Sequence, residues 1–239
     1  SSLSPCQVVD GNLWFMESAL TNMNAFTGLT KVGGSLLMKM NFELTDISGL
    51  SSLNHVGTNL DITYNYQLES LDGLNGLEHV GRHIELKHNG LRNLSGLSGL
   101  KSVGGDFDIQ FSSIFEMNGL HNLVSVGGTL TIYSNAVLSR ISELSALTSV
   151  GGLQIRWNTQ LSAIADLPAL STIESTLKVT HNKSLEDIGG LSSVSAVGGN
   201  LWVASNQTLC QSHVTALVAS IGDGLSGDIA STAENDEGC

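Results

Sequence analysis

The chain of 239 residues has little of several components on which most globular proteins rely. It contains two prolines, three cysteines and 5% aromatic residues. No apolar run approaches the roughly 18 residues that a membrane-spanning helix needs. Basic residues are also scarce, with 10 Lys and Arg against 22 Asp and Glu and a net charge of −12. This acidity disfavours nucleic acid and anionic membrane surfaces as partners. We therefore expect no transmembrane segment and no polyanionic ligand.

What the chain has instead is a glycine-rich repeat. An apolar residue, followed in eight of nine cases by one or two glycines, recurs every 23 or 24 residues, at Val9, Val32, Val56, Val80, Val103, Val126, Val150, Ile173 and Val197. Self-similarity with a period of 20 to 29 residues indicates a solenoid with one structural turn per repeat. The nine starts predict an all-β solenoid of about nine coils.

Each repeat combines two apolar periods. In "VGGTLTIYSN" at 126–135, Leu130 and Ile132 alternate with other residues, which predicts a short strand with one buried face. The remainder of a repeat has a period of three, as at Leu68, Leu71, Leu74 and Leu77. Such a period fits a regularly bending chain that turns every third side chain inward. Together the two periods predict a closed coil around a dry core.

The paired glycines have a mechanical interpretation and a chemical one. A glycine reaches a positive φ, or tolerates backbone crowding from the adjacent coils, at the lowest cost. A phosphate-binding loop would need a helix after the glycines, whereas here a strand follows. No Ser/His/Asp or Cys/His arrangement is apparent. We expect a non-enzyme without a cofactor or metal.

An amide side chain recurs at the end of each predicted strand. Stacked amides at a turn can bond the backbone of their own coil and of the next, and so satisfy buried polar groups. Ser18 and Ser112 replace the amide in two coils. The predicted ladder consists of Asn41, Asn65, Asn89, Asn135, Asn158, Asn182 and Asn206.

The cysteines lie near the two ends of the chain. Strands about 4.8 Å apart make nine coils a rod roughly 40 Å long, which separates Cys6 from the other two cysteines. A disulfide requires Cα atoms within about 7 Å, so Cys210 pairs with Cys239. Such a bridge favours a secreted or cell-surface protein. We expect one solenoid domain over 1–239, with repeats over 9–209 and a disulfide-closed cap with an amphipathic helix over 210–239.

The repeats "GGTLTIYSNAVL" and "GGNLWVASNQTL", the helix and the terminal "NDEGC" resemble the receptor L-domain family, and its secreted bacterial members in particular. These are leucine-rich-repeat-like modules of insulin-type and epidermal-growth-factor-type receptors. The resemblance implies a right-handed β-helix that binds a ligand or partner and has no catalytic activity. The chain lacks the cysteine-rich region of the receptors. A leucine-rich-repeat horseshoe has a related strand motif and is the alternative fold.

The outward strand positions are the candidate site. The position before each ladder residue holds rings in five coils, at Tyr64, His88, Phe111, Trp157 and His181, and Tyr133 lies on a neighbouring column. These rings are either half-buried filler at a corner or a platform for a sugar or a protein surface. Acids occupy another outward column in three consecutive coils, at Asp61, Glu85 and Asp108. They form either a solvated column balanced by lysines or a group of close carboxylates.

Three classes of function fit this pattern. The first is an exported, non-catalytic binding or adhesion module that recognises an extracellular protein or a glycan through the outward strand face. The second is a carbohydrate-active β-helix enzyme that uses the three acids as acid and base. The third is a structural or ice-binding rod, although ice binding favours a regular array of threonines that the outward columns lack. The pattern sets neither the ligand nor the oligomeric state.

Overall fold

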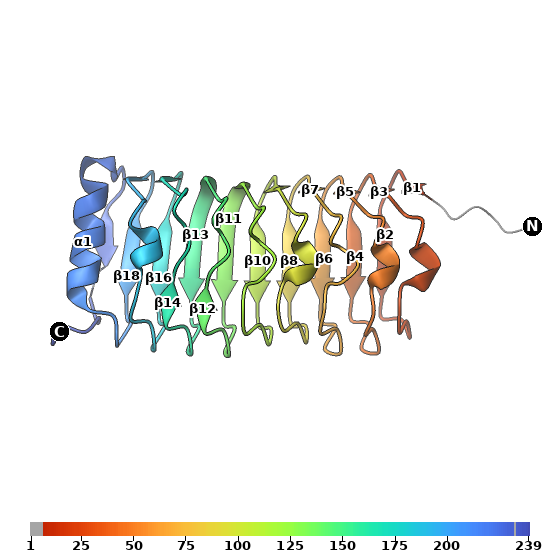
Figure 1. Ribbon diagram of the computed structural model, residues 1–239, viewed down its shortest axis with the longest axis horizontal. Coiled ribbons are helices and arrows are strands. Elements are labelled where there is room, and N and C mark those ends of the chain that lie inside the picture. Colours follow the sequence, from red (N-terminus) through yellow and green to blue (C-terminus); the bar gives the residue numbers. More distant parts are fainter. Residues whose placement is uncertain (1–6, 232) are drawn as a thin grey trace, which may run out of the picture.

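The computed structural model describes residues 7–231 and 233–239, so Cys6 and the question of its partner lie outside the described residues. The described chain is a mostly-β parallel solenoid of about nine coils with one C-terminal helix, which confirms the predicted fold class. The coils stack in a row, with the N-terminal coil at one end and the helix α1 at the other (Figure 1).

Most coils contribute two strands to one side of the stack. The two-residue strands at the repeat starts are β1 (Val8–Val9), β3 (Lys31–Val32), β5 (His55–Val56), β7 (His79–Val80), β9 (Ser102–Val103), β15 (Thr172–Ile173) and β17 (Ala196–Val197). The four-residue strands after the glycines are β2 (Leu13–Met16), β4 (Leu36–Lys39), β6 (Leu60–Thr63), β8 (Ile84–Lys87), β10 (Phe107–Gln110), β16 (Leu177–Thr180) and β18 (Leu201–Ala204). In the sixth and seventh coils the two merge into β11 (Ser125–Tyr133) and β13 (Ser149–Arg156).

These strands pair in parallel and in register. Leu130 faces Leu153, and Ile132 faces Ile155, so equivalent residues of successive coils lie side by side. Within the described residues the pairing builds a sheet of 17 strands, and β12 (Arg140–Ile141) and β14 (Ala163–Ile164) form a small second sheet. Register between equivalent positions is what turns the repeat into continuous columns of side chains.

The opposite side of each coil carries the period of three. The leucines at 68, 71, 74 and 77 are fully buried, as this period predicts. Four coils form a single 3₁₀ turn here, at η1 (Asn24–Phe26), η2 (Ser48–Leu50), η3 (Ser95–Leu97) and η4 (Gly189–Leu191). Inward leucines, isoleucines and valines from both sides meet in one core that runs the length of the stack.

At most repeat starts a glycine lies where the stacked backbones crowd one another, although Glu174 occupies this place in the eighth coil. A Cβ on Gly57 or on Gly81 would lie 2.0 Å from the carbonyl oxygen of the equivalent glycine one coil earlier. Neither residue has a positive φ; among the described glycines that conformation occurs at Gly73, Gly119 and Gly222. Of the two mechanical interpretations of the glycine pair, close approach of stacked backbones is the one found at these positions.

The asparagines are buried and connect each coil to both neighbours. The Nδ2 of Asn158 donates to the Ile132 carbonyl in the preceding coil at 3.0 Å. Its Oδ1 accepts the backbone N–H of Asn135, and its own backbone N–H donates to the Oδ1 of Asn182, both at 3.0 Å. Each of the other asparagines also donates to a carbonyl of the preceding coil and accepts a backbone N–H from it, as Asn89 does with Ile62 and Asn65. One side-chain type thus satisfies buried backbone groups at each of these corners.

The ladder differs from the sequence pattern at two places. At Ser112 the hydroxyl donates to the Gln110 carbonyl of its own coil, at 3.2 Å, and not to the preceding coil. Beyond the last predicted member, Asn235 accepts the backbone N–H of Asn206 at 3.2 Å and donates to the Val203 carbonyl at 2.8 Å. The ladder therefore continues into the C-terminal tail, where the repeat spacing has already ended.

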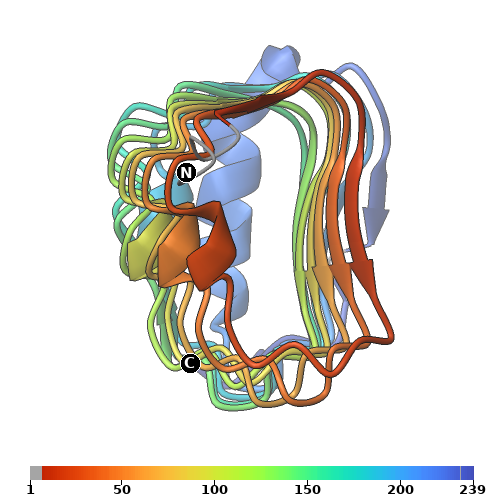
Figure 2. The same ribbon diagram turned by 90° about the vertical axis from the view of Figure 1, so that its right-hand side faces the viewer.

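The helix α1 (Gln211–Ile221) covers the end of the core (Figure 2). Its residues Val214, Leu217 and Ile221 are buried, which removes apolar surface of the last coil from water. A 3₁₀ turn, η5 (Gly222–Gly224), follows, and β19 (Ile229–Ser231) adds a parallel strand beside β18.

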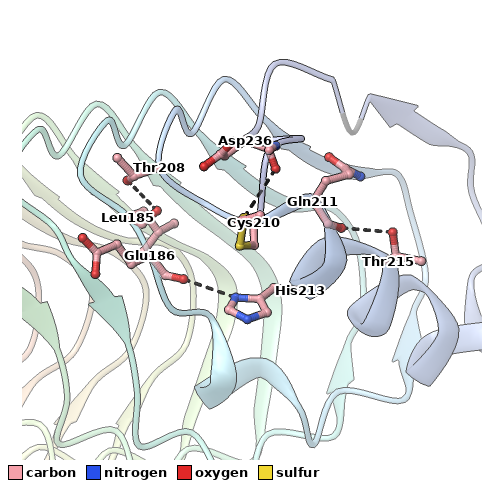
Figure 3. Close-up of a disulfide and its surroundings, with 10 residues drawn as sticks. Leu185, Glu186, Thr208, Cys210, Gln211, His213, Thr215 and Asp236 are labelled. Atoms are coloured by element: carbon pink, nitrogen blue, oxygen red, sulfur yellow. Dashed lines mark hydrogen bonds between the residues drawn. A yellow bond between two sulfur atoms is a disulfide. The ribbon is translucent and has the colours of Figure 1, made fainter.

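A disulfide joins Cys210 and Cys239, whose Cα atoms are 5.7 Å apart (Figure 3). Next to it, the ring of His213 on α1 bonds the Glu186 carbonyl at 3.2 Å, which ties the helix to the preceding coil. The C-terminal tail is therefore held by a covalent bond, a strand and a ladder residue.

Removing a ladder amide should destabilise the stack strongly. Asn158→Ala leaves the buried Asn135 N–H without its partner and removes the side-chain hydrogen bond to the Ile132 carbonyl, which still faces the neighbouring strand. One unsatisfied buried group costs about 1–3 kcal/mol of unfolding free energy. Urea denaturation measures this loss, and hydrogen exchange of the Asn135 amide should accelerate. Unchanged exchange at that amide would contradict the role assigned to the ladder.

Restoring the missing amide should have the opposite effect. Ser112→Asn places an amide donor opposite the Leu86 carbonyl of the preceding coil. The other ladder amides donate to the equivalent carbonyl, as Asn65 does to Met38 and Asn135 to Ile109. We expect a gain of about 1 kcal/mol in unfolding free energy, the usual value of one hydrogen bond. A urea midpoint at or below that of the unchanged chain would contradict the expectation.

Candidate functional site

The candidate ring column occupies an unusual backbone conformation. The residue before each ladder position has a positive φ of 48° to 60° in all nine coils, namely Glu17, Met40, Tyr64, His88, Phe111, Ser134, Trp157, His181 and Ser205. This left-handed conformation costs a non-glycine residue about 1–2 kcal/mol. Met40 and Ser134 adopt it without a ring stack, so backbone hydrogen bonds between coils, such as Ser134 N–H to the Arg156 carbonyl, hold the conformation.

Five of the predicted rings meet in stacks. The ring of His88 lies between Tyr64 and Phe111, with centroid distances of 4.6 and 4.4 Å and nearly parallel planes. Trp157 and His181 form a second stack at 4.2 Å. Ser134 separates the two groups, and Phe111 and Trp157, which border it, are 41% and 43% exposed. The ring faces mainly contact one another, whereas these two rings also present surface to solvent.

The sixth predicted ring, Tyr133, comes from the neighbouring column. It packs edge-on against Phe111 at 5.1 Å. The guanidinium of Arg156, one coil later, lies 5.2 Å from the Tyr133 ring centroid. A similar contact near the C-terminal end places the Lys178 ammonium 4.6 Å from the Trp202 ring. Cations and rings on this face are thus held by one another.

The three acids of the second column lie on adjacent strands, and a lysine connects two of them. Asp61 faces Glu85, and Glu85 faces Asp108. The Nζ of Lys87 lies 3.3 Å from Glu85 and 3.0 Å from Asp108. Burial by itself lowers the pKa of Lys87, but the hydrogen bond and charge of Asp108, with the charge of Glu85, raise it overall. Lys87 is therefore a fixed cation between two carboxylates.

Asp61 has a different environment. Partial burial raises the pKa of its carboxyl group above the ordinary 3.8, and the negative charge of Glu85 adds to the effect. Beside it lies a hollow of about 220 Å³, lined by Trp14, Ser35, Leu37, Asn59, Asp61, His83 and Glu85. Among the described residues no group of three or more His, Cys, Asp or Glu side chains is arranged to hold a metal ion.

Not every outward position is accessible. Thr63, Thr131 and Thr180 project from the outward side of their strands, yet they are at most 8% exposed. Strands about 4.8 Å apart allow long neighbouring side chains to cover a short one. The accessible face consists of ring edges and charged groups. The alternation of buried and outward residues along the strands therefore overestimates how many side chains are exposed to a partner.

Unpaired polar atoms gather on the same face. In the described part of the chain, two buried side-chain atoms, Arg156 Nε and His181 Nδ1, have no hydrogen-bond partner in the protein. Asp61 Oδ1 and Thr63 Oγ1 lack a well-aligned partner, although the side chains of Asp61 and Thr63 interact with each other. All four residues belong to the outward columns. Unsatisfied buried groups are rare in native proteins and call for an explanation such as a bound molecule.

Hollows also occur away from the predicted face. One of about 260 Å³ lies between α1 and the coil it covers, lined by residues that include Ile188, His213 and Leu217. Another of about 350 Å³ lies at the corner that follows the ladder, between Tyr66 and Phe115. The sequence analysis predicted neither hollow. The second could have been found from the repeat, because one residue is missing there between the ladder residue and the next core residue. In the described residues no helix is both long and apolar enough to span a membrane.

The raised pKa of Asp61 predicts a pH dependence of stability. The folded chain holds this proton more tightly than the unfolded chain, so ionisation of Asp61 lowers stability as the pH rises through the raised value. Asp61→Asn removes this effect. Its melting temperature should exceed that of the unchanged chain at pH 7, and the two should agree near about pH 3, where both side chains are neutral.

Asp46 provides the control of opposite sign. Hydrogen bonds from Ser48 lower the pKa of Asp46, so its contribution to stability is present above the ordinary pKa and is lost as the pH falls through the lowered value. Asp46→Asn should therefore melt at a lower temperature than the unchanged chain at neutral pH. Thermal melts of both variants across the pH range test the two predictions. If both substitutions shift the melting temperature at pH 7 in the same direction, the predictions are wrong.

Comparison with known proteins gives a limited result. No family model matches the chain, and no curated protein matches it in sequence. Among solved structures the chain is similar to an internalin from Listeria monocytogenes, at 17% sequence identity and a TM-score of 0.42. The similarity covers 90% of this chain and 65% of the internalin chain, so the chain spans less than two thirds of that protein. A likeness at this level assigns neither a partner nor an activity.

Proposed function

We propose that the chain is a non-catalytic binding module that recognises an extracellular protein or a glycan through its outward strand face. The observation that carries the proposal is the concentration of exposed ring surface and fixed charges on this one face. Phe111 and Trp157 are 41% and 43% exposed there, and Arg156 and Lys87 are held beside them by ring and carboxylate contacts. A partner that covers these groups buries apolar surface and finds polar groups already in place.

The arrangement of charges supports the same proposal. Lys87 is held between two carboxylates, and Arg156 and Lys178 lie over rings, so these long side chains have lost part of their freedom before any partner arrives. Side chains fixed in advance lower the entropy cost of binding. The stacked rings add rigid apolar edges to the same surface, of the kind that anchors interfaces.

The setting and the family belong to the proposal too. The disulfide between Cys210 and Cys239 favours an oxidising location, and we therefore place the protein outside the cell or at its surface. The strand, ladder and cap pattern supports membership of the receptor L-domain family within the wider group of leucine-rich-repeat-like solenoids. Neither assignment depends on the internalin comparison.

A binding screen with matched variants tests the proposal. The chain is probed against arrays of extracellular proteins and glycans, and each partner is then measured with Trp157→Ala and Arg156→Ala. Both side chains lie on the outward face, so each variant should weaken binding about tenfold or more, as for central interface residues. Val124→Ala is the control, because Val124 is 45% exposed and precedes β11. Binding that survives both face variants would overturn the assigned surface.

One observation favours an enzyme as the second candidate. A carboxyl group with a raised pKa beside other carboxylates is the arrangement of a glycosidase acid and base, and Asp61 has such a pKa next to Glu85. The combined variant Asp61→Asn, Glu85→Gln, Asp108→Asn should abolish any glycan hydrolysis detected with a polysaccharide panel. Hydrolysis that persists in this variant would exclude these acids as the catalytic groups.

A further inference from the structure

The corner after the ladder is shortened in three coils, two of which are neighbours. Most coils place two residues between the ladder residue and the next core residue, as in the segment 65–68. The first, fourth and fifth coils place only one there, in the segments 18–20, 89–91 and 112–114. Inside the stack the shortening therefore affects the fourth and fifth coils, and the ladder is interrupted in the fifth, at Ser112. Departures from local rules that cost stability concentrate at functional sites.

The shortened corner forms a hollow of about 350 Å³. It is lined by Tyr66, Glu69, Gly90, Arg92, Ser113 and Phe115. Gly90 occupies the place that Tyr66 occupies one coil earlier, and a Cβ there would lie 2.4 Å from the Tyr66 carbonyl oxygen. The hollow is therefore kept open by a missing residue and by a position that admits no side chain without backbone movement.

Two exposed rings border this corner hollow. Tyr66 in the third coil and Phe115 in the fifth are each 55% exposed. Phe42 stacks on Tyr66 from the second coil, with centroids 6.0 Å apart and planes 6° from parallel, so the opposite face of Tyr66 is turned toward the fourth coil. The third and fifth coils are two rungs, about 9–10 Å, apart in the stack. The hollow between them has room for a single sugar ring against the free face of Tyr66, with Phe115 at its far edge.

A fixed ion pair supplies the polar edge. Arg92 donates to Glu69 at 2.8 Å, and both side chains are more than half exposed. The hydrogen bond and charge of Glu69 raise the pKa of Arg92. An exposed pair of this kind adds little to stability, but it holds guanidinium donors beside carboxylate acceptors. Neighbouring hydroxyl groups of a sugar act as donor and acceptor together and match that edge.

The charge of the site decides between neutral and acidic sugars. Glu69 compensates the positive charge of Arg92, and the whole chain carries a net charge of −12. An anionic ligand would gain no electrostatic attraction here. An uncharged ligand with one hydroxyl-bearing ring suits this hollow. The hollow offers it aromatic rings, a neutral pair of donors and acceptors, and the Ser113 hydroxyl.

We propose that this corner hollow binds one sugar unit of a neutral glycan. The hollow lies beyond the ladder from the outward strand face and adjoins it where Tyr66 packs edge-on against Tyr64, with ring centroids 6.4 Å apart. The inference rests on the proposed non-catalytic binding role. Tyr66 and Phe115 contact the sugar ring, and Arg92 and Glu69 bond its hydroxyl groups. A long glycan would continue along the corner beyond the hollow, where Phe42 is also exposed.

The test uses the full chain and four neutral hexasaccharides, built from glucose, mannose, galactose or N-acetylglucosamine. Binding is measured by saturation-transfer NMR and by titration calorimetry, with Tyr66→Ala, Phe115→Ala and Arg92→Ala as site variants. Val137→Ala is the matched control, because Val137 is 45% exposed on the same corner one coil after Phe115. Thermal melts establish that each variant keeps the fold, as expected for exposed side chains.

We expect at least one hexasaccharide to bind, with affinity lowered tenfold or more by each site variant and unchanged by the control. If a hexasaccharide binds and only Trp157→Ala on the strand face weakens it, the corner site is overturned while the proposed function stands. If no hexasaccharide binds, the neutral-glycan inference is overturned, and a protein partner found in the array screen would still support the proposed function. Absence of any partner in both experiments would count against both.

Discussion

The hydrogen bonds of the inward asparagines are the interaction on which the stack depends. Each amide bonds the coil before it, and a ladder N–H donates to the amide of the next coil wherever that coil carries an asparagine. The corners lie inside the protein, where water cannot replace these bonds. The distance between successive coils is therefore the same at this corner as in the sheet. Because the distance is constant, the same residue type stacks on itself from end to end.

Several features of the molecule follow from this fixed spacing. Backbones at the repeat starts approach so closely that a Cβ has no room, which explains the glycines without a phosphate or a positive φ. Rings one coil apart fall at 4.2 to 4.6 Å, within the range of aromatic stacking. The left-handed backbone before each ladder residue places these rings in one column, so structure and candidate site share one cause.

Where the spacing is broken, the surface changes. The fourth and fifth coils lose one residue at the corner, and the ladder loses its amide at Ser112. The outward strand face stays regular over these coils, because the strands on the other side remain in register. A solenoid can therefore alter one corner locally without disturbing the sheet, which is why the corner hollow forms beside a regular strand face.

The sequence by itself determined the coil number, the strands, the ladder, the cap helix and the cysteine pairing, because each depends on spacing within a repeat or between the ends of the rod. It also determined which residues form outward columns. Only the tertiary structure decided that the rings stack face to face, that Lys87 joins two acids, that outward threonines are covered and that Asn235 extends the ladder. These outcomes depend on side-chain contacts between coils, which a period of 23 or 24 residues does not encode.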